Sequence, residues 1–261
     1  MDTTARRATI AERLMLEGEA SIVELAATFG TSEMTIRRDL DLLEVKGLAR
    51  RARGGAIAVQ SRSFEPPILQ RATHMALAKR RIGAAGAELL RENETVVLDV
   101  GTTTHEMAKA IHPDLHVTVI TSSLLIATEL STKPRVRTIV SGGVVRHGEM
   151  SLVGARAESS YGDLNCDTVF LGVAGISDAK GVSEYNLDDA KVKQAAIASG
   201  RRIVVLADSS KLGQVAFVTV APMREVNLLI TDAGPENPVV RSIKKQGIEV
   251  LHVEPAQKEN D

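Results

Sequence analysis

Residues 31–40 read TSEMTIRRDL, and this stretch decides the fold of the amino-terminal part of the chain. Ile36, Leu40 and Leu43 recur at positions i, i+4 and i+7, which places them on one buried face of a predicted helix. Successive helical residues are rotated by about 100°, so Arg37 and Arg38 turn away from that face. The two arginines are therefore predicted to face solvent, where a partner outside the chain can use them.

A second predicted helix lies just before this one. Ser21 and Glu24 match the S-x-x-E pattern of a capping box at its start. The apolar residues that follow recur at i, i+3, i+4 and i+7 and comprise Ile22, Leu25, Ala26 and Phe29. Gly30 suits a left-handed cap at its end, and Ser32 can cap the next helix at once. Two helices joined by so short a turn, after a helical pattern at residues 5–16, predict a helix-turn-helix.

A β-hairpin is predicted after these helices. The third helix is expected to end at Gly47, and residues 48–59 then read LARRARGGAIAV. Gly54-Gly55 separates two short segments and permits the positive φ angles of a tight turn. We interpret this hairpin as a wing beside the helix-turn-helix.

Positive charge gathers around the predicted hairpin. Residues 46–63 hold five basic residues and no acidic one, whereas residues 2–24 hold three basic and five acidic residues. An α-helix fits the major groove of DNA, where arginine can donate two hydrogen bonds to a guanine edge, and a basic wing can hold phosphates. These features together favour DNA binding. The simpler alternative is a solvated helix face on which Arg38 pairs with Asp41 or Asp39.

Residues 22–56, IVELAATFGTSEMTIRRDLDLLEVKGLARRARGGA, resemble the winged helix-turn-helix of DeoR-family bacterial transcription regulators. The shared pattern is E-L-A, then S-x-x-T-I-R-R-D-L-x-x-L-E-x-x-G, then R-x-x-G-G-A. The resemblance implies that the helix with Thr35, Arg37 and Arg38 reads DNA. The chain departs from the pattern at Ala52-Arg53, where the family more often has a histidine before Gly-Gly. The expected DNA-binding residues are Ser32, Thr35, Arg37, Arg38, Arg50, Arg51, Arg53, Gly54 and Gly55.

Composition limits the class of protein. A chain of 261 residues, 44% of them hydrophobic, is long enough for a small domain and a medium one. The formal net charge of -1 means that a polyanion such as DNA has to be met by a local patch. Cys166 is the only cysteine, and no signal peptide or membrane-length apolar run is evident. We therefore expect a cytoplasmic protein without disulfides, metal, cofactor or membrane partner.

We predict a two-domain chain. Residues 1–58 form the winged helix-turn-helix domain, 59–74 a linker with Pro66-Pro67, 75–255 an α/β domain and 256–261 a disordered tail. The larger domain alternates helical patterns with short β-branched runs, which favours a largely parallel sheet. The helical patterns are ALAKRRIGAAGAELL, SLLIATEL and DDAKVKQAAIAS; the strand patterns are TVVLD, HVTVIT, VRTIV, DTVFLGV, RRIVVLAD, VNLLIT and IEVLHV.

Ligands of such sheets bind beyond the carboxyl ends of strands, and polar residues follow two predicted strands closely. In LDVGTTTHEM (98–107), Asp99 could accept a sugar hydroxyl. Thr102–Thr104 adjoin the free N–H groups of a starting helix, which suits a phosphate, although a threonine-rich helix cap is the simpler alternative. In VVLADSSKLG (204–213), Lys211 is a cation that could complete the phosphate site.

A third strand end, FLGVAGISDAKGVSEYNLDDAKVK (170–193), is glycine-rich and then polar. It leads into a helix with Asp189 and Lys193 at i and i+4, a spacing that allows a simple surface ion pair. Arg146, after the tight SGGVV turn, is a further candidate cation, although an arginine in a loop is more often only solvated.

Residues 75–253 resemble the DeoR-type sensor domain, which shares its fold with ribose-5-phosphate isomerase. The shared motifs are D-x-G-T-T-T, T-S-S-L, S-G-G, F-L-G, N-L-x-x-A-x-V-K and D-S-S-K-x-G. The resemblance implies that the threonine loop and Lys211 hold the effector's phosphate. Asp189 replaces a usual glutamate and Ser122 a common asparagine. The expected effector-binding residues are Asp99, Gly101, Thr102, Thr103, Thr104, Ser122, Ser123, Gly143, Arg146, Gly172, Asn186, Asp189, Lys193, Asp208 and Lys211.

Catalytic motifs are missing from the sequence. The resembling isomerases carry aspartates in a D-G-A-D-E motif, but the matching residues 171–175 read LGVAG. His105-Glu106 begins an H-E-x-x-H zinc motif, yet Lys109 stands in place of the second histidine. We therefore expect a regulator and no enzyme activity.

The expected function is that of a DeoR-type repressor of a carbohydrate-catabolism operon, released from operator DNA when a phosphorylated sugar or polyol binds. A single winged domain buries limited surface, so a homodimer or homotetramer on repeated or palindromic half-sites is expected. Two alternatives stay open: an activator that answers an unphosphorylated ligand, and a sugar-phosphate isomerase-like enzyme.

Overall fold

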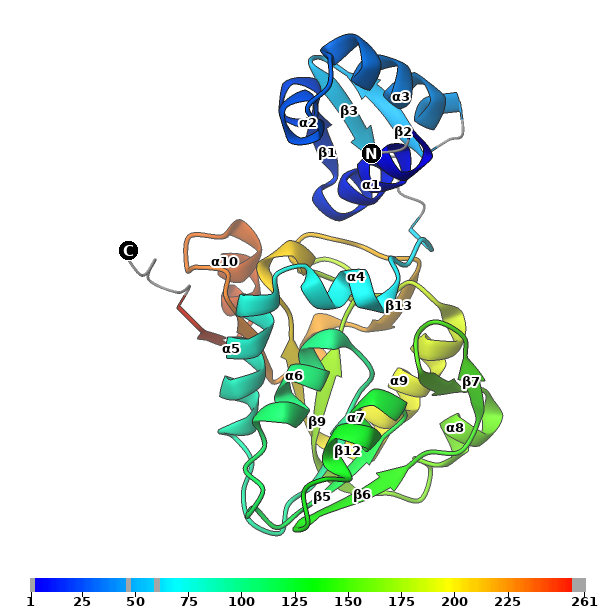
Figure 1. Cartoon of the computed structure of the whole chain (residues 1–261). Coiled ribbons are helices and arrows are strands. Elements are labelled where there is room, and N and C mark those ends of the chain that lie inside the picture. The colour runs from blue at the N-terminus through cyan, green and yellow to red at the C-terminus, as the bar shows by residue number, and fades with distance from the viewer. Residues whose placement is uncertain (1–2, 46–47, 59–61, 255–261) are drawn as a thin grey trace, which may run out of the picture. The chain divides into compact units, whose positions relative to one another are not determined.

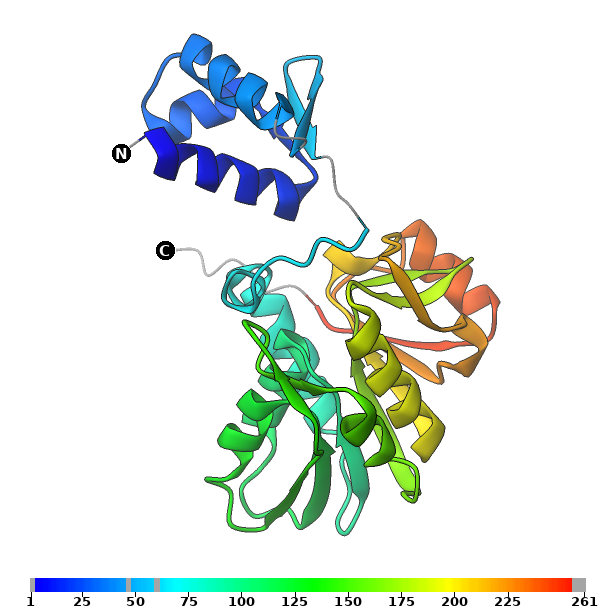
Figure 2. The same ribbon diagram turned by 90° about the vertical axis from the view of Figure 1, so that its right-hand side faces the viewer.

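The computed structural model describes residues 3–45, 48–58 and 62–254. These residues form two compact units, which divide between Pro66 and Pro67 (Figures 1 and 2). The division falls within the linker that the sequence predicts. No helix in the described ranges combines the length and apolar character that a membrane crossing requires.

Some sequence predictions lie outside the described residues. They are the helix end at Gly47, residues 59–61 of the linker, and the tail at 256–261. The rest of the predicted linker contains a short helix, α4 (Ile68–Thr73), which belongs to the larger unit.

The amino-terminal unit packs three helices against a small sheet. Its elements are α1 (Thr3–Glu17), β1 (Glu19–Ser21), α2 (Ile22–Phe29), α3 (Glu33–Val45), β2 (Ala49–Ala52) and β3 (Gly55–Ala58). Strand β3 lies between β1 and β2, antiparallel to both. Ile36, Leu40 and Leu43 are buried with Leu14 of α1 and Leu25 of α2, as the helical spacing predicts. The predicted winged helix-turn-helix is confirmed.

The start of α2 differs from the sequence prediction. The Ser21 side chain makes no cap hydrogen bond, because this residue ends β1 and is paired there with Gly55 of β3. Glu24 lies near Arg13 of α1 instead, with 3.3 Å between Oε2 and Nη2. The predicted capping box is therefore wrong, whereas Gly30 caps the end of α2 in the left-handed region (φ +58°), as expected.

The hairpin turn also differs by one residue. Arg53 and Gly54 form the turn, Gly54 with φ +84°, and Gly55 is already the first residue of β3. A Cβ on Gly55 would lie 2.1 Å from the carbonyl oxygen of Ala20. The glycine is thus required by the close approach of β1, a strand that the sequence analysis missed.

Asp39 fixes helix α3 to α1. Its buried carboxylate accepts hydrogen bonds from Arg6 Nε (2.7 Å, to Oδ2) and Arg7 Nε (2.6 Å, to Oδ1). Burial acts to raise the pKa of Asp39, but the hydrogen bonds and charges of the two arginines outweigh it and hold the pKa below its ordinary value. The alternative in which Arg38 pairs with Asp39 is therefore wrong.

The larger unit is built on one parallel sheet. Its seven strands are β4 (Thr95–Leu98), β5 (Val117–Thr121), β6 (Val136–Val140), β9 (Cys166–Gly172), β12 (Gly200–Leu206), β14 (Leu228–Thr231) and β15 (Glu249–His252). They lie in the order β15-β14-β12-β9-β4-β5-β6, and every neighbouring pair is parallel. Each predicted strand pattern supplies one of them, which confirms the predicted α/β class.

Helices cover both faces of this sheet (Figure 2). They are α5 (Ala76–Ala87), α6 (Thr102–Ala110), α7 (Leu124–Leu130), α8 (Ala155–Ser159), α9 (Leu187–Ser199) and α10 (Pro238–Lys245). Met107 of α6 and Ile126 of α7 belong to one apolar cluster, whereas Val192 of α9 and Ile243 of α10 belong to the other. Alternate strand residues enter the two clusters, which is why the strands read as continuous apolar runs.

Two small antiparallel pieces were missed by the sequence analysis. One is a three-stranded sheet of β10 (Gly175–Ser177), β11 (Gly181–Glu184) and β13 (Val218–Ala221). The other is a hairpin of β7 (Val144–Arg146) and β8 (Ser151–Val153). Both carry polar residues that bear on the site below, and their strands are too short for an alternation to be read reliably from sequence.

We predict that Asp39→Asn destabilises the amino-terminal unit by about 2 kcal/mol, because two charge-assisted hydrogen bonds are weakened. A carboxyl whose pKa is lowered by folding contributes stability above its unfolded pKa and loses it as pH falls through the folded value. The deficit of the variant should therefore be full at pH 7 and shrink below about pH 4.

Thermal unfolding of the wild type and the variant at both pH values measures this difference. Glu19→Gln, which neutralises an exposed carboxylate of β1 in the same unit, is the matched control. An equal loss of stability in both variants, or a loss independent of pH, would contradict the assignment.

Candidate functional site

The exposed face of α3 presents the arginine pair found in the sequence. Ser32 precedes the helix, and its Oγ accepts a hydrogen bond from the N–H of Thr35 (3.2 Å), as predicted. Arg37 is exposed and lies 3.4 Å from Glu33 (Nη2 to Oε2), a weak contact at a solvated surface. Arg38 is exposed and makes no ion pair with any residue that the structure describes. Both guanidinium groups are thus accessible to a partner.

The wing arginines are not equivalent. Arg51 is half-buried between the wing and α3: its Nε lies 3.5 Å from Asp41 Oδ1, and its backbone N–H donates to Glu44 Oε1 (2.8 Å). Arg50 and Arg53 are exposed. Arg51 therefore helps to hold the wing against α3, while Arg50 and Arg53 are accessible to a polyanion.

In the larger unit, the predicted ligand residues converge on one edge of the sheet. Strands β12, β9, β4 and β5 are neighbours and parallel, so their carboxyl ends lie together. At these ends lie Asp208, two residues after β12; Gly172, the last residue of β9; and Asp99 and Ser122, which directly follow β4 and β5. The fold therefore brings the predicted motifs to the position where ligands of such sheets bind.

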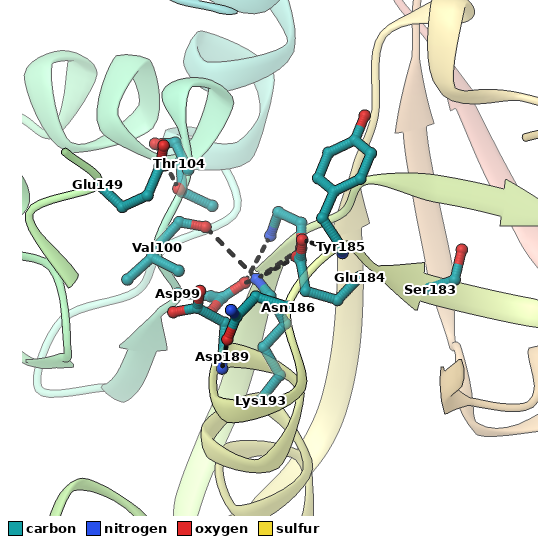
Figure 3. A network of polar contacts seen from close by, with 12 residues as sticks. Asp99, Val100, Thr104, Glu149, Ser183, Glu184, Tyr185, Asn186, Asp189 and Lys193 are labelled. Atoms are coloured by element: carbon teal, nitrogen blue, oxygen red, sulfur yellow. Dashed lines mark hydrogen bonds and ion pairs between the residues drawn. The ribbon is translucent and has the colours of Figure 1, made fainter. Parts of the chain in front are cut away.

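Lys193 of α9 occupies the centre of this edge (Figure 3). It is 2% exposed, forms an ion pair with Asp99, and lies 3.4 Å from Glu184 (Nζ to Oε2). Its Nζ also donates to the carbonyl of Gly172 (3.0 Å), while the Gly172 N–H donates to Asp99 Oδ2 (3.0 Å). Oxygen atoms from several loops thus meet on one ammonium group.

The charges of this cluster alter its proton affinities. Burial raises the pKa of Asp99 to about 6, although Lys193 acts in the opposite direction. Burial alone would lower the pKa of Lys193, but the carboxylates of Asp99 and Glu184 outweigh it and raise that pKa. Lys193 is therefore a firmly charged structural cation at this edge.

The predicted surface ion pair between Asp189 and Lys193 is wrong. Lys193 points into the protein, and Asp189 pairs with Arg146 of β7 at 2.5 Å (Oδ2 to Nη1). The same contact overturns the alternative of a merely solvated Arg146. Asn186 caps α9, its Oδ1 accepting the N–H groups of Asp188 (2.8 Å) and Asp189 (3.2 Å).

The three threonines form the first turn of α6. Gly101 precedes them with φ +149°, and Thr103 and Thr104 are buried. The Thr104 hydroxyl donates to the carbonyl of Gly101 (3.0 Å), and no side chain that the structure describes caps the start of α6, so the simpler alternative of a threonine cap is wrong. The first N–H groups of a helix have no partner within the helix, which suits the start of α6 to an anion.

Three further predicted residues have identifiable structural roles beside this edge. Ser123 caps α7 by accepting the N–H of Ile126 (3.3 Å), and the buried Ser122 accepts the N–H of Leu152 through its carbonyl (2.8 Å). Gly143 has φ +124° and packs so closely on β8 that a Cβ would lie 2.6 Å from the carbonyl oxygen of Val153.

Sequence analysis missed Lys79 of α5, which lies beside Asp208. Asp208 is fully buried; its Oδ1 accepts the N–H of Ser210 (3.1 Å), whereas its Oδ2 has no hydrogen-bond partner in the described residues and lies 4.0 Å from Lys79 Nζ. Burial lowers the pKa of Lys79 to about 8, with Asp208 acting in the opposite direction and Lys211 in the same direction. The helical spacing of the sequence could have predicted that Lys79 is buried, because Lys79 lies on the same face of α5 as the buried residues Ile82, Gly83 and Gly86.

An ion pair between Arg71 and Glu149 was also missed. Arg71 belongs to α4, Glu149 to the turn of the β7–β8 hairpin, and their side chains are 16% and 11% exposed. The carbonyl of Arg71 accepts a hydrogen bond from Lys79 Nζ. These residues are 78 positions apart, and nothing in their local sequences marks the contact.

The edge is therefore rich in paired charges and in helix N–H groups. Such a site can bind an anion with hydroxyl groups, since cations and free N–H groups attract negative charge and carboxylates and amides accept hydroxyl protons. Within the described ranges, no group of three or more His, Cys, Asp or Glu side chains is placed to hold a metal ion.

Comparison with known proteins agrees with both units. Residues 6–62 match the model of the DeoR-like helix-turn-helix domain, and residues 75–233 match that of the DeoR C terminal sensor domain. Among solved structures, the chain is similar to ribose 5-phosphate isomerase A from Methanocaldococcus jannaschii, with a TM-score of 0.41, 13% identity, and coverage of 53% of this chain and 55% of that one.

Curated relatives match over nearly the whole chain. The HTH-type transcriptional regulator GlpR of Haloferax volcanii is 33% identical, covering 94% of this chain and 96% of that protein. The glycerol-3-phosphate regulon repressor of Escherichia coli is 30% identical, covering 96% and 99%. With both domain models matched in order, the chain belongs to the DeoR family of helix-turn-helix transcriptional regulators, and is not an enzyme.

Proposed function

We propose that this regulator is the repressor of a carbohydrate-catabolism operon and that a phosphorylated sugar or polyol releases it from its operator. The observation that carries the effector class is the first turn of α6 at Thr102–Thr104, whose N–H groups have no partner within the helix, with the cations Arg71 of α4 and Lys79 of α5 on helices that pack against α6. A helix N-terminus favours a charged phosphate over an uncharged hydroxyl group.

The names of relatives support the same class of ligand. The Escherichia coli relative is a glycerol-3-phosphate regulon repressor, and glycerol 3-phosphate is a phosphorylated polyol. Similarity over 96% of this chain supports a related effector. Asp189 and Ser122, which we propose face the sugar or polyol, are expected to select a ligand whose carbon chain differs.

We assign the phosphate to Thr102–Thr104 and Lys211. The threonine segment offers hydroxyls and unpaired helix N–H groups, and a helix N-terminus favours negative charge. Asn186 and Asp189 at the start of α9, with Ser122 after β5, are assigned to the hydroxyl groups of the ligand. Asp99 and Lys193 hold the edge in shape beneath it.

On the DNA side, Thr35, Arg37 and Arg38 are assigned to base edges in the major groove, and Arg50 and Arg53 to backbone phosphates. One winged unit buries too little surface for a unique site in a genome, so we propose that a homodimer or homotetramer binds paired half-sites in the cytoplasm.

We predict that one phosphorylated sugar or polyol, and not its unphosphorylated parent, raises the melting temperature of the protein. Binding to the folded state alone adds about 2.7 kcal/mol at a hundred times the Kd, which corresponds to a shift of about 5–10 °C for a chain of this size. A thermal-shift screen of paired compounds measures it. Stabilisation by parents alone, or by no compound, would remove the proposed effector class.

Replacing both Thr103 and Lys211 by alanine should weaken binding of the identified phosphate compound about a hundredfold and leave operator binding intact. The hydroxyl and the ammonium group are assigned to the phosphate, and neither residue lies in the DNA-binding unit. Titration calorimetry and a mobility-shift assay measure the two properties. Lys180→Ala, which removes an exposed lysine elsewhere in the larger unit, is the control. Unaltered ligand affinity in the double variant would place the phosphate elsewhere.

Replacing both Arg37 and Arg38 by alanine should weaken operator binding at least a hundredfold, because two groups that can read base edges are lost. Since phosphate contacts release counterions, operator affinity of the wild type should also fall as salt rises. Arg13→Ala, which removes a positive charge from α1 of the same unit, should change affinity little. A double variant that shifts operator DNA like the wild type would exclude α3 as the reading helix.

A further inference from the structure

The β7–β8 hairpin is held by an ion pair on each side. Arg146 on β7 binds Asp189 of α9, and Glu149 in the turn binds Arg71 of α4. Figure 2 shows the hairpin reaching up to α4 from the body of the unit. The hairpin therefore connects two helices on either side of the carboxyl edge of the sheet.

The carboxylate of Glu149 occupies a position suited to a ligand's anion. In Figure 3 its side chain points toward Thr104, in the first turn of α6. Helix α4, which carries Arg71, also packs against α6. Glu149 thus places a negative charge between a guanidinium group and a helix N-terminus, a combination that binds phosphate as well as carboxylate.

We propose that Glu149 is an internal anion that holds the phosphate position in the ligand-free protein, and that a phosphate dianion displaces it and takes over Arg71. This inference rests on the proposed effector class and adds Arg71 to the residues that bind the effector. Phosphate offers more acceptor oxygens and more negative charge than a carboxylate, so Arg71 gains by the exchange.

The proposed exchange involves a helix close to the segment that follows the DNA-binding unit. Arg71 lies in α4, which begins at Ile68, the second residue of the larger unit. Its carbonyl is also held by Lys79, beside Asp208 and the DSSK segment. A change of partner at Arg71 therefore alters what fixes α4.

Backbone conformation at both ends of the ion pair favours such a change. Met75, between α4 and α5, has φ +54°, and Met150, next to Glu149, has φ +56°. Non-glycine residues adopt this left-handed conformation rarely and keep it only where surrounding contacts impose it. Loss of the contact at Glu149 thus removes one of the contacts that hold the turn at Met150.

The test compares phosphate affinity among four proteins: wild type, Glu149→Gln, Arg71→Gln and Glu158→Gln. Glu158 lies in α8, close in sequence to the hairpin, and has no ion pair in the described residues, which makes it the matched control. Inorganic phosphate is titrated calorimetrically at constant ionic strength. We expect Glu149→Gln to bind about tenfold more tightly, since no carboxylate has to leave, and Arg71→Gln about tenfold more weakly.

Hydrogen exchange supplies a second readout on the full-length protein. Phosphate should speed exchange at residues 147–150 in the wild type, and Glu149→Gln should show the faster exchange without phosphate. Equal phosphate affinity in wild type, Glu149→Gln and Arg71→Gln, or no phosphate binding by any of them, would overturn the exchange. The proposed effector class would survive either result as long as a sugar or polyol phosphate still stabilises the wild type.

Discussion

The ammonium group of Lys193 is the interaction on which the carboxyl edge of the sheet depends. It joins the segment after β4 at Asp99, the end of β9 at Gly172, and the end of β11 at Glu184. Two buried carboxylates without a cation would be strongly destabilising, by about 3–5 kcal/mol for a broken pair. Since the first turn of α6 follows Asp99 by three residues, the position of the threonine segment is set by the same contact.

Pairing of buried or half-buried acids with cations continues around the carboxyl edge of the sheet. Five acids accompany five cations: Asp99, Glu184, Asp189, Glu149 and Asp208 with Lys193, Arg146, Arg71, Lys79 and Lys211. These ten formal charges cancel without a ligand. A dianion that simply added itself would leave an excess of negative charge in a partly buried place, so binding favours the departure of a carboxylate or the uptake of a proton. Glu149 can leave because it lies in a hairpin turn, and Asp99, with its pKa near 6, can take up a proton.

The parts of this molecule that follow from local pattern could be predicted, and the parts that follow from distant contacts could not. The strands were recognisable because they are rich in β-branched and apolar residues, which in β4 and β14 fill both faces, and α3 was recognisable because Ile36 and Leu40 keep its period. Lys193 was expected at the surface because its i,i+4 spacing from Asp189 gives no information about its contact with Asp99, which lies 94 residues away in the sequence. Arg71 with Glu149, and Asp39 with two arginines of α1, escaped prediction for the same reason.

The two units hold their buried or half-buried carboxylates in different ways. In the amino-terminal unit both oxygens of Asp39 are occupied by arginines of α1, so α3 is fixed while Arg37 and Arg38 remain exposed. At the sheet edge, Glu149 lies in a hairpin turn and pairs with Arg71, the contact that we propose an anion of higher charge displaces. Because the contacts of α3 lie within its own unit, we propose that the response to a ligand acts on α4, the helix that follows Pro66-Pro67 and carries Arg71.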